Sequence, residues 1–596
     1  MSYHAPVADI AFTLRHVAGL DRLAEEGAFP DLTPDLVGQI LEEAGKFAGE
    51  RIAPLNQIGD RCGAQLVDGA VRMPPGWREV YRAWCDAGWN AVSAPVDCGG
   101  QGLPHLVNAA CIEMWNAASM AFGLGPLLTM SAVEAIAAHG SDQLKRIYLG
   151  KLVSGEWMGT MNITEAQAGS DLGALRTRAE RQPDGSYRLH GTKVFITYGE
   201  HDLTDNIIHL VLARLPDAPE GTRGLSLFLV PKVLVADDGT LGARNDVVCT
   251  GIEKKLGIHA SPTCTMQFGD REGAVGYLVG EENRGLTCMF TMMNHARLAV
   301  GLQGVAIADR AFQQALSYAR DRRQGRAPGW SGEGMSPIVE HPDVKRMLLE
   351  MRAKTEAARA LCYAVAGALD RAAFAPAAAA RASADDVASL LTPVAKAFST
   401  DIGVEVASLG VQVHGGAGYV EETGAAQHLR DARIAAIYEG TNGIQAVDLV
   451  SRKLPARGGQ VARGHISELR GILQQARSAN DSGLGGTAVW IGQSVDALER
   501  TTHWMLDAVE TRPADALAGA TPYLRLFALA TGGAYLAKKA LAAMAELRAG
   551  STDPHHGLRV ASARFFAAHL ATAAAGLEAA ITEGAEAIGT AFGDAA

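Results

Sequence analysis

The segment Gln412-Val413-His414-Gly415-Gly416-Ala417-Gly418-Tyr419 is the most informative stretch of the chain, because it places three glycines within four residues. Glycine lets the backbone come close to a bound group, so that backbone N–H groups can face an anion such as a pyrophosphate. A plain turn between two helices produces the same pattern. Taken by itself, the segment leaves both interpretations open.

A carboxylate occupies an unusual position further along the chain, in Tyr438-Glu439-Gly440-Thr441. It follows the apolar run 434–438 and precedes a glycine. An acidic side chain that loses contact with water has a raised pKa, and a raised pKa suits a general base. The ordinary alternative is a carboxylate favoured by the dipole at the start of a helix.

A third polar segment, Thr164-Glu165-Ala166-Gln167-Ala168-Gly169-Ser170-Asp171, directly follows a run that is typical of a strand. Its hydroxyl groups and backbone donors suit a polar cofactor ring or a phosphate. The segment alone is a weak signal, since loops often carry hydroxyl groups that bind nothing.

Together these segments resemble the acyl-CoA dehydrogenase family. The family's TEPGAGSD motif matches residues 164–171, with Ala166-Gln167 in place of Pro-Gly, and its YEGT motif matches residues 438–441. The family's Q-x-x-G-G motif matches Gln412, Gly415 and Gly416. Its P-x-x-x-G-G-x-G motif matches Pro95, Gly99, Gly100 and Gly102. The motifs occur in the family's order between about residues 35 and 455, so a chance resemblance is excluded.

The local sequence pattern agrees with this resemblance. Helical periodicity precedes about seven strand-like runs between residues 157 and 278, and long helical patterns follow from about residue 281. The expected fold is α+β and mostly α, with the ranges 1–34 (N-terminal extension), 35–156 (helical domain), 157–280 (central β-barrel domain), 281–455 (four-helix bundle) and 456–596 (helical extension). Within the bundle the expected helices are 297–320, 343–369, 386–408 and 440–452, and Pro54 is expected to stop an early helix at Ala53.

The resemblance implies bound FAD. By position in the family motifs, the residues on the β domain that are expected to contact FAD are Ile163, Thr164, Gly169, Ser170, Phe195 and Thr197. Arg322, Gln412 and Gly416 are expected to reach the FAD of a neighbouring subunit, and Gly415 and Thr441 complete the cofactor set. This arrangement implies a homo-oligomer, either a dimer or a dimer of dimers.

The resemblance also implies a reaction, the α,β-desaturation of an acyl-CoA thioester. Glu439 would remove the α-proton, the β-hydride would pass to FAD, and an electron-transfer flavoprotein would accept the electrons. The residues expected to contact the substrate are Ser170, Asn294, Arg297, Tyr438 and Gly440. Asn294 departs from the family, in which an acidic residue is common at this position.

The length of the chain points to a subgroup. Ordinary members of the family end near the position of Arg457, whereas this chain has 596 residues. The segments 199–204, 255–261 and 439–445 look most like the long bacterial 3-methylmercaptopropionyl-CoA dehydrogenases. A fatty acyl-CoA dehydrogenase for medium or long chains, an acyl-CoA oxidase and a DNA-binding relative with little dehydrogenase activity stay open as alternatives.

The amino-acid composition argues against several other functions and sites. The chain has 54 Lys and Arg and 65 Asp and Glu residues, a net charge of −11, which opposes a general nucleic-acid binder. Its eight cysteines form no CxxC pair, so neither a zinc cluster nor a disulfide framework is indicated, and no metal site is expected. Without a recognisable signal peptide or membrane span, the expected location is the cytoplasm.

Overall fold

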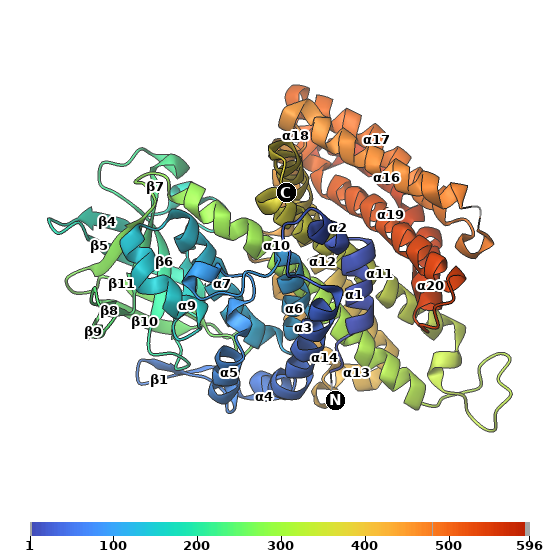
Figure 1. Cartoon of the computed structure of the whole chain (residues 1–596), viewed down its shortest axis with the longest axis horizontal. Coiled ribbons are helices and arrows are strands. Elements are labelled where there is room, and N and C mark those ends of the chain that lie inside the picture. Colours follow the sequence, from blue (N-terminus) through green and yellow to red (C-terminus); the bar gives the residue numbers. More distant parts are fainter. Residues whose placement is uncertain (1–2, 480, 591–596) are drawn as a thin grey trace.

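Four regions follow one another along the chain, and in Figure 1 the β region lies at one side, the extension at the other, and the first helices lie together with the bundle between them. The computed structural model describes residues 3–479 and 481–590, and all their side chains except those of Asn294 and Thr590. Helices come first, then a β region, then a bundle of long helices, and finally a helical extension. This order confirms the expected α+β fold, while the domain limits drawn from the sequence stay a prediction.

The first region is mainly helical and carries one small β-hairpin. Its elements are α1 (Val7–His16), α2 (Leu20–Glu25), α3 (Pro34–Phe47), α4 (Leu55–Cys62), β1 (Gln65–Val67), β2 (Ala70–Arg72), α5 (Trp77–Asp86), α6 (His105–Ala118), α7 (Met120–His139), α8 (Asp142–Leu144) and α9 (Gly150–Val153). Thr33 caps α3, since its hydroxyl accepts a hydrogen bond of 3.2 Å from the backbone N–H of Leu36.

The helix before Pro54 ends at Ile52, as predicted, but Ala53 does not take the extended backbone expected before a proline, and α4 begins directly afterwards at Leu55. Ala53 keeps a right-handed helical backbone, with φ −58° and ψ −35°. A π-helical turn, Ala48–Ile52, lies just before it, and the Ala53 N–H donates to the Ala48 carbonyl over 2.8 Å. The wider π turn leaves space for the proline ring, which would clash in a regular α-helix.

Two stretches are long and apolar enough to cross a membrane by length and hydropathy, Met120–His139 and His556–Thr582, although no span is expected from the sequence. The first is α7, and its most apolar window is 83% buried inside the structure. The second is divided between α20 (His556–Phe565), two irregular helical turns and α21 (Ala574–Thr582). Core packing therefore accounts for the apolar composition of α7.

The β region forms a small closed barrel with extra strands at its edges. Its strands are β3 (Met158–Asn162), β4 (Arg178–Arg181), β5 (Tyr187–Thr197), β6 (Ile207–Arg214), β7 (Leu225–Pro231), β8 (Val233–Val235), β9 (Leu241–Arg244), β10 (Val247–Ile252), β11 (Thr263–Phe268) and β12 (Ala274–Val279). Pairing runs from β5 through β12, β7 and β6 to β4, and β4 returns to β5. The closure confirms the expected β-barrel and leaves β3, paired in parallel with β6, beside the helices.

Three long helices form the body of the third region, and they are longer than the sequence pattern predicts. They are α10 (Gly285–Asp321), α11 (Pro342–Phe374) and α12 (Ala378–His414). The helices α10 and α12 pack closely, because a Cβ on Gly304 would lie only 2.2 Å from the Ser399 carbonyl oxygen. The short helices α13 (Gly416–Tyr419), α14 (Ala425–Ala432) and α15 (Asn442–Asp448) follow, and α15 continues into a π-helical turn, Leu449–Lys453.

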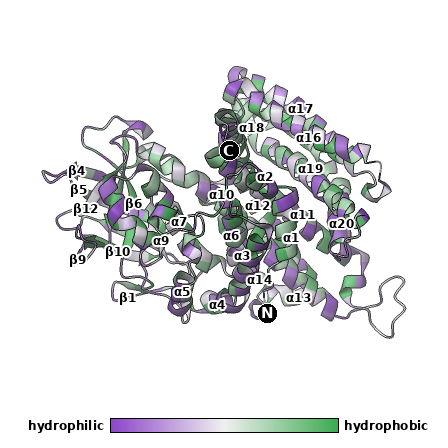
Figure 2. Cartoon of the chain, in the orientation of Figure 1, coloured by the Kyte–Doolittle hydropathy of each residue, from purple (hydrophilic) through white to green (hydrophobic). Residues whose placement is uncertain are grey.

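The C-terminal extension is a second helical layer packed on the bundle. It consists of α16 (Gln460–Ser478), α17 (Thr487–Thr511), α18 (Pro513–Ala518), α19 (Ala520–Arg548), α20, α21 and α22 (Ala585–Thr590). A Cβ on Gly532 of α19 would lie 3.2 Å from the Ala357 Cβ of α11, so these helices nearly touch. In Figure 2 the central helices α6 and α12 are mainly green, whereas α16 and α17 at the edge mix purple and green.

The N-terminal helix α1 is held between the bundle and the extension. The Asp9 carboxylate is buried and receives hydrogen bonds from Arg352 of α11 over 2.7 Å and from Arg559 of α20 over 2.9 Å. The Arg559 guanidinium also lies 4.0 Å from the centre of the Phe12 ring. One aspartate thus joins three regions that are far apart in sequence.

Candidate active site

Glu439 lies in a loop between two short helical turns, and its backbone has φ 55°. A left-handed conformation is strained for any residue with a Cβ, and costs about 1–3 kcal/mol. The side chain is half-buried. Among the described residues, none accepts a hydrogen bond from the Glu439 backbone N–H.

Two buried side chains hold this strained loop. The Gln445 amide donates to the carbonyl oxygens of Glu439 and Gly440, each over 3.1 Å. The Lys396 ammonium on α12 donates to the Gly440 carbonyl over 2.8 Å and to the Asn442 Oδ1 over 3.0 Å. Gly440 has φ 84°, and a Cβ there would lie 2.8 Å from the Gln445 Nε2, so only glycine fits.

The electrostatics of the loop favour a proton acceptor. Burial raises the pKa of Glu439, and the positive charges of Lys396 and Arg297 partly oppose that rise. Burial also lowers the pKa of Lys396 to about 7, although Glu439 and Asp401 act in the opposite direction. A carboxylate with a raised pKa therefore lies beside a buried amine, an arrangement that suits proton transfer near neutral pH.

The neighbouring Tyr438 anchors the loop to the first region. Its hydroxyl donates a short hydrogen bond to the Gln303 side chain on α10. The Gln303 amide in turn donates to the Asn116 Oδ1 on α6 over 3.1 Å. Tyr438 thus fixes the position of the loop through a buried relay and presents no free hydroxyl to a substrate.

Arg297 lies close to the same loop but is not exposed. Its Nη1 donates to the Asp448 Oδ2 over 2.9 Å, and the residue is only 4% exposed. Its positive charge acts on Glu439, as described above. The contact with CoA that the family resemblance implies for Arg297 stays a prediction.

The segment 164–171 is fastened to β5 by a buried ion pair. The Lys193 ammonium lies 2.9 Å from the Glu165 Oε1, and the hydroxyl and backbone N–H of Thr177 also donate to that carboxylate. Burial would raise the pKa of Glu165, but Lys193 outweighs it and the pKa falls to about 2. The Thr164 carbonyl accepts from the Val194 N–H over 2.9 Å, so Ile163 and Thr164 lie beside the end of β5.

Phe195 has an unusual position on β5. It has φ 61° and is 61% exposed, although the residues on either side of it are buried or half-buried. Thr197, two residues further along, is tied to β3, because its carbonyl accepts from the Thr160 hydroxyl over 2.6 Å. Gly169 and Ser170 are exposed, and a Cβ on Gly169 would meet no atom within 4 Å. This end of β5 therefore offers an exposed aromatic ring beside an open polar loop.

The other predicted cofactor residues gather at a different place. Arg322 follows the end of α10, and Gln412 and Gly415 lie at the end of α12. The rings of Tyr318 and His414 stack with their centres 4.4 Å apart, which joins these two helix ends. Arg322, Gln412, Gly415 and Gly416 are all exposed, and a Cβ on either glycine would meet no atom within 4 Å.

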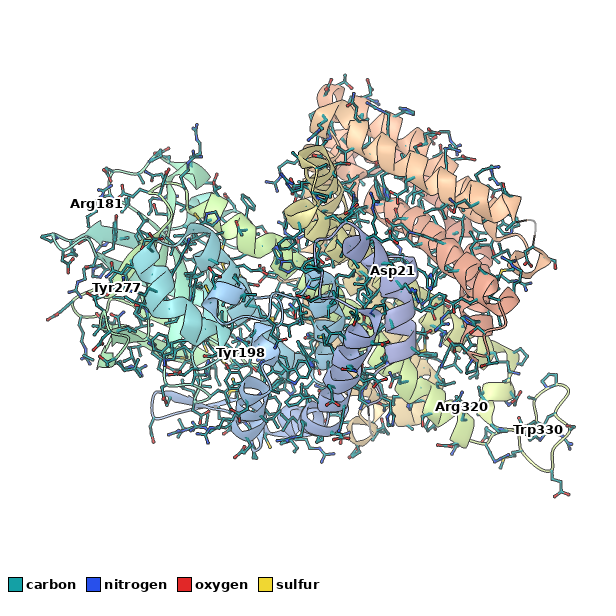
Figure 3. All side chains as sticks on the ribbon, viewed as in Figure 1. Asp21, Arg181, Tyr198, Tyr277, Arg320 and Trp330 are labelled. Carbon is teal, nitrogen blue, oxygen red and sulfur yellow. The ribbon has the colours of Figure 1, made fainter. Side chains whose placement is uncertain are left out.

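The second set lies at the end of α10 that is away from the β region. The first residue of α10, Gly285, lies against Ser226 at β7, whereas Arg322 follows its last residue. A helix of 37 residues spans about 55 Å, at about 1.5 Å per residue. In Figure 3, Arg320 near the end of α10 lies on the opposite side of the molecule from Arg181 and Tyr277 of the β region.

The two sets fit the two halves of an FAD site. The exposed Phe195 ring and the polar loop suit a flat ring system, and the exposed Arg322 with the open glycines suits a pyrophosphate. Thr441 lies beside Glu439 and caps α15, because its hydroxyl accepts from the Ile444 N–H over 3.2 Å. The side chain of Asn294, predicted to contact substrate, lies outside the described residues.

Sequence reasoning missed Lys396, Gln303 and Gln445, which hold the Glu439 loop. Lys396 carries the clearest signal, since it is a charged residue inside an apolar helical run, 390–398. A buried lysine in such a run is unusual and points to a specific partner. The partner itself, the Gly440 carbonyl, could not be identified without the structure.

Models of the acyl-CoA dehydrogenase N-terminal, middle and C-terminal domains match residues 38–156, 160–271 and 283–454. A model described as acetyl-CoA dehydrogenase C-terminal like matches residues 466–590, in the helical extension. The matches follow one another without overlap and include both segments that carry the predicted site.

Individual proteins agree with these matches. The chain is 48% identical to a 3-methylmercaptopropionyl-CoA dehydrogenase from Ruegeria pomeroyi, over 95% of this chain and 96% of the relative. It is 35% identical to a butyryl-CoA dehydrogenase from Syntrophomonas wolfei, over 79% of each. A solved structure of an acyl-CoA dehydrogenase with FAD from Bacillus anthracis is 21% identical and has a TM-score of 0.71, covering 95% of this chain and 90% of that one. The chain therefore belongs to the acyl-CoA dehydrogenase family, whose members are FAD-dependent oxidoreductases.

Proposed function

We propose that this enzyme desaturates 3-methylmercaptopropionyl-CoA to its 2-enoyl-CoA, with Glu439 as the base that removes the α-proton. The identity of the substrate rests on the similarity to the Ruegeria protein, which extends over nearly the whole of both chains. The role of Glu439 rests on one observation, a half-buried carboxylate held in a strained loop beside an unpartnered backbone N–H.

The raised pKa of Glu439 serves proton removal. Burial makes the carboxylate more basic than one in water, so that it accepts a weakly acidic proton more readily. The positive charges of Lys396 and Arg297 oppose part of this rise in the pKa of Glu439. The base must be ionised to work, so the rate is expected to increase with pH through this pKa.

The backbone N–H of Glu439 is suited to donate a hydrogen bond to the carbonyl oxygen of the thioester. Negative charge develops on that oxygen as the α-proton leaves, and a preorganised donor stabilises the charge. One such donor is worth about 3–4 kcal/mol in enzymes that use backbone amides in this way. The hydrogen bonds from Gln445 and Lys396 fix the peptide groups on either side of Gly440, and with them the direction of this donor.

FAD, when bound, accepts the hydride that leaves the β-carbon. The chain's own part is to place Phe195 and the loop 164–171 on one side of the site and Glu439 on the other. We propose that Arg322, Gln412, Gly415 and Gly416 act on the FAD of a partner subunit in a dimer, because they are exposed at the end of α10 that is away from the β region. An electron-transfer flavoprotein in the cytoplasm is the proposed electron acceptor.

A short straight acyl chain is the second candidate substrate. The butyryl-CoA dehydrogenase from Syntrophomonas favours it, with 35% identity over 79% of each chain. The methylthiopropanoyl group has the same number of heavy atoms in line as a pentanoyl group, so length alone does not separate them. A thioether is more polarisable than a methylene group, and contacts with it provide the discrimination.

Anaerobic flavin bleaching with matched thioesters tests the substrate. We expect faster bleaching with 3-methylmercaptopropionyl-CoA than with pentanoyl-CoA, by at least about 10-fold, which corresponds to about 1.4 kcal/mol. Butyryl-CoA and octanoyl-CoA complete the series. Faster bleaching with pentanoyl-CoA or octanoyl-CoA would contradict the proposed substrate, and peroxide release in air at the full turnover rate would identify an oxidase instead.

Replacing the base tests the mechanism. Glu439→Gln keeps the size of the side chain but removes its ability to accept a proton, so bleaching should slow by at least about 100-fold. The flavin content of the purified variant should equal that of the wild type. Glu421→Gln, in the exposed turn 421–423, is the control and should bleach normally. Bleaching by Glu439→Gln at the wild-type rate would contradict the assignment.

A further inference from the structure

Three side chains that commonly bind metals meet outside the active site. His105 begins α6, Glu134 lies on α7 and His295 lies on α10. The Glu134 Oε1 is 3.3 Å from the His295 Nδ1 and 4.0 Å from the His105 Nδ1. The three donor atoms all lie within 4.8 Å of one another. The helices that carry them lie together near the centre of the molecule (Figure 1).

Glu134 lacks an ordinary structural partner. Among the described residues, only His105 and His295 place a basic nitrogen within 4.0 Å of its carboxylate. Its Oε2 is buried and has no hydrogen-bond partner in the described part of the chain. Among the described residues no lysine or arginine pairs with this buried carboxyl group, so a bound cation would give it the charged partner that its neighbours do not supply.

The two imidazoles are in the form that binds metals. Burial lowers the pKa of His105 to about 4 and that of His295 to about 3, so both rings are neutral at pH 7. Burial raises the pKa of Glu134 above its usual range, and no lysine or arginine lowers it. A bound cation would reverse that rise and release the proton.

The donor set and its spacing suit zinc. Two imidazole nitrogens and one carboxylate oxygen are common ligands of Zn²⁺ at about 2.0–2.2 Å, which places tetrahedral donors about 3.3–3.5 Å apart. The Glu134 to His295 separation of 3.3 Å already matches. The His105 to Glu134 separation of 4.0 Å requires only a small rotation of the His105 ring.

A cavity gives access to the cluster. It has a volume of about 800 Å³ and is lined by His105 and Glu134 together with apolar side chains such as Leu32, Val133 and Phe374. Among the described residues, its lining does not include Glu439. His295 and Arg297 are two residues apart on α10, about 200° around the helix, so the cluster and the Glu439 loop lie on different sides of it.

A second carboxylate makes this region more negative. Both Asp370 oxygens accept hydrogen bonds of 2.8 Å, from the backbone N–H groups of His105 and Leu106. Burial raises the pKa of Asp370 to about 7, although these two bonds lower it. Because both oxygens are occupied, Asp370 orients the start of α6 and His105 with it.

We propose that His105, Glu134 and His295 bind one zinc ion, with a fourth coordination position open to the cavity. Three protein ligands and one open position distinguish such a site from closed structural zinc sites, which have four protein ligands. The ion would join α6 and α7 of the first region to α10 of the bundle, and water would fill the open position.

Zinc content tests the proposal directly. The flavin-loaded full chain is stripped with a chelator, incubated with Zn²⁺, dialysed, and measured by mass spectrometry of the metal. We expect about one zinc per chain for the wild type and less than about 0.1 for Glu134→Gln and for His295→Gln. His139→Gln is the matched control, because His139 lies on the same helix as Glu134 but hydrogen-bonds to Thr291 over 2.8 Å. This variant should keep the full zinc content.

Two further measurements separate loss of the site from loss of folding. Zinc should raise the melting temperature of the wild type and of His139→Gln but not that of Glu134→Gln. X-ray absorption at the zinc edge of the wild type should show nitrogen and oxygen neighbours at about 2.0–2.2 Å. Absence of zinc from the wild type, equal zinc in Glu134→Gln, or sulfur neighbours would each overturn the proposal.

Discussion

At the scale of single residues, the Glu439 loop has a strained backbone that hydrogen bonds from neighbouring side chains hold in place. Glu439 adopts φ 55° and Gly440 φ 84°, and the side chains of Gln445 and Lys396 hold the carbonyl groups of this turn. The strain persists because the surrounding hydrogen bonds allow no relaxed alternative. The loop keeps its carboxylate and its free N–H in fixed directions before any substrate arrives.

The Lys396 charge is expected to set the pH range of catalysis. Lys396→Met removes a positive charge that lowers the pKa of Glu439, so that pKa should rise. Since the base works only when ionised, the acid limb of the bleaching rate should move to higher pH. Rates of flavin bleaching between pH 5 and 9 measure the shift.

A nearby lysine provides the control for that shift. Lys453→Met removes the ammonium that donates to the Ser389 hydroxyl over 2.8 Å. Lys453 is not among the groups that act on the pKa of Glu439, so its acid limb should stay in place. An unshifted acid limb in Lys396→Met would show that Lys396 only supports the fold of the loop.

At the scale of elements, α1, α11 and α20 depend on one buried charge cluster. Burial would raise the pKa of Asp9, but Lys539, Arg352 and Arg559 outweigh it and hold the pKa below its usual range. The folded pKa lies below the unfolded one, so this stabilisation is complete above the unfolded pKa. It is lost as pH falls through the folded value.

Removing Asp9 is expected to loosen the N-terminal helix. Asp9→Asn removes one carboxylate from Arg352 and Arg559, which keep their pairs with Glu356 and Asp553, and the lost charged hydrogen bonds should cost about 1.5–3 kcal/mol. Thermal unfolding should begin at a lower temperature, and limited proteolysis should cut within residues 3–20 sooner. Asp21→Asn, which breaks an exposed pair with Arg15, should cost only about 0–1 kcal/mol. Equal effects of the two variants would contradict the proposed clamp.

Local patterns predicted the kinds of element well and their ends less well. The order of helices, strands and bundle follows from periodicity, and the cap at Thr33 follows from its side chain. The helical backbone angles of Ala53, directly before Pro54, could not be predicted, because the π turn that precedes them has no signal in the sequence pattern. The cluster of His105, Glu134 and His295 could not be predicted either, since only tertiary packing brings these three helices together.

At the scale of the whole molecule, Arg322 of the predicted FAD site follows the last residue of α10, whereas the first residue of α10 lies against β7 of the β region. A two-fold dimer solves this separation, because each subunit then presents its Arg322 end to the other's β5 end. The family motifs predicted that two subunits contribute residues to each FAD site. The length of α10 agrees with this prediction, because it holds Arg322 away from the β region of its own chain.

A mixed dimer tests the division. Glu439→Gln and Arg322→Ala are co-expressed with different tags, and the heterodimer is purified. If Arg322 acts on the partner's site, one of the two sites carries both defects and the other carries neither. The heterodimer should then have about half the wild-type bleaching, although each homodimer has little. An inactive heterodimer would place Arg322 on the site of its own chain.

The hydrogen bond between Asp9 and Arg559 also has a consequence for synthesis. The two residues are 550 positions apart, and ribosomes add about 5–20 residues per second, so the start of the chain waits about 0.5–2 minutes for its partner. During that time Asp9 and the Phe12 ring of α1 lack their contacts with Arg559. A polypeptide cut short before residue 559 would never form these contacts. The hydrogen bond between Asp9 and Arg559 therefore forms only after residue 559 has been synthesised. Before that point, chaperones and proteases meet a chain whose N-terminal helix lacks this contact.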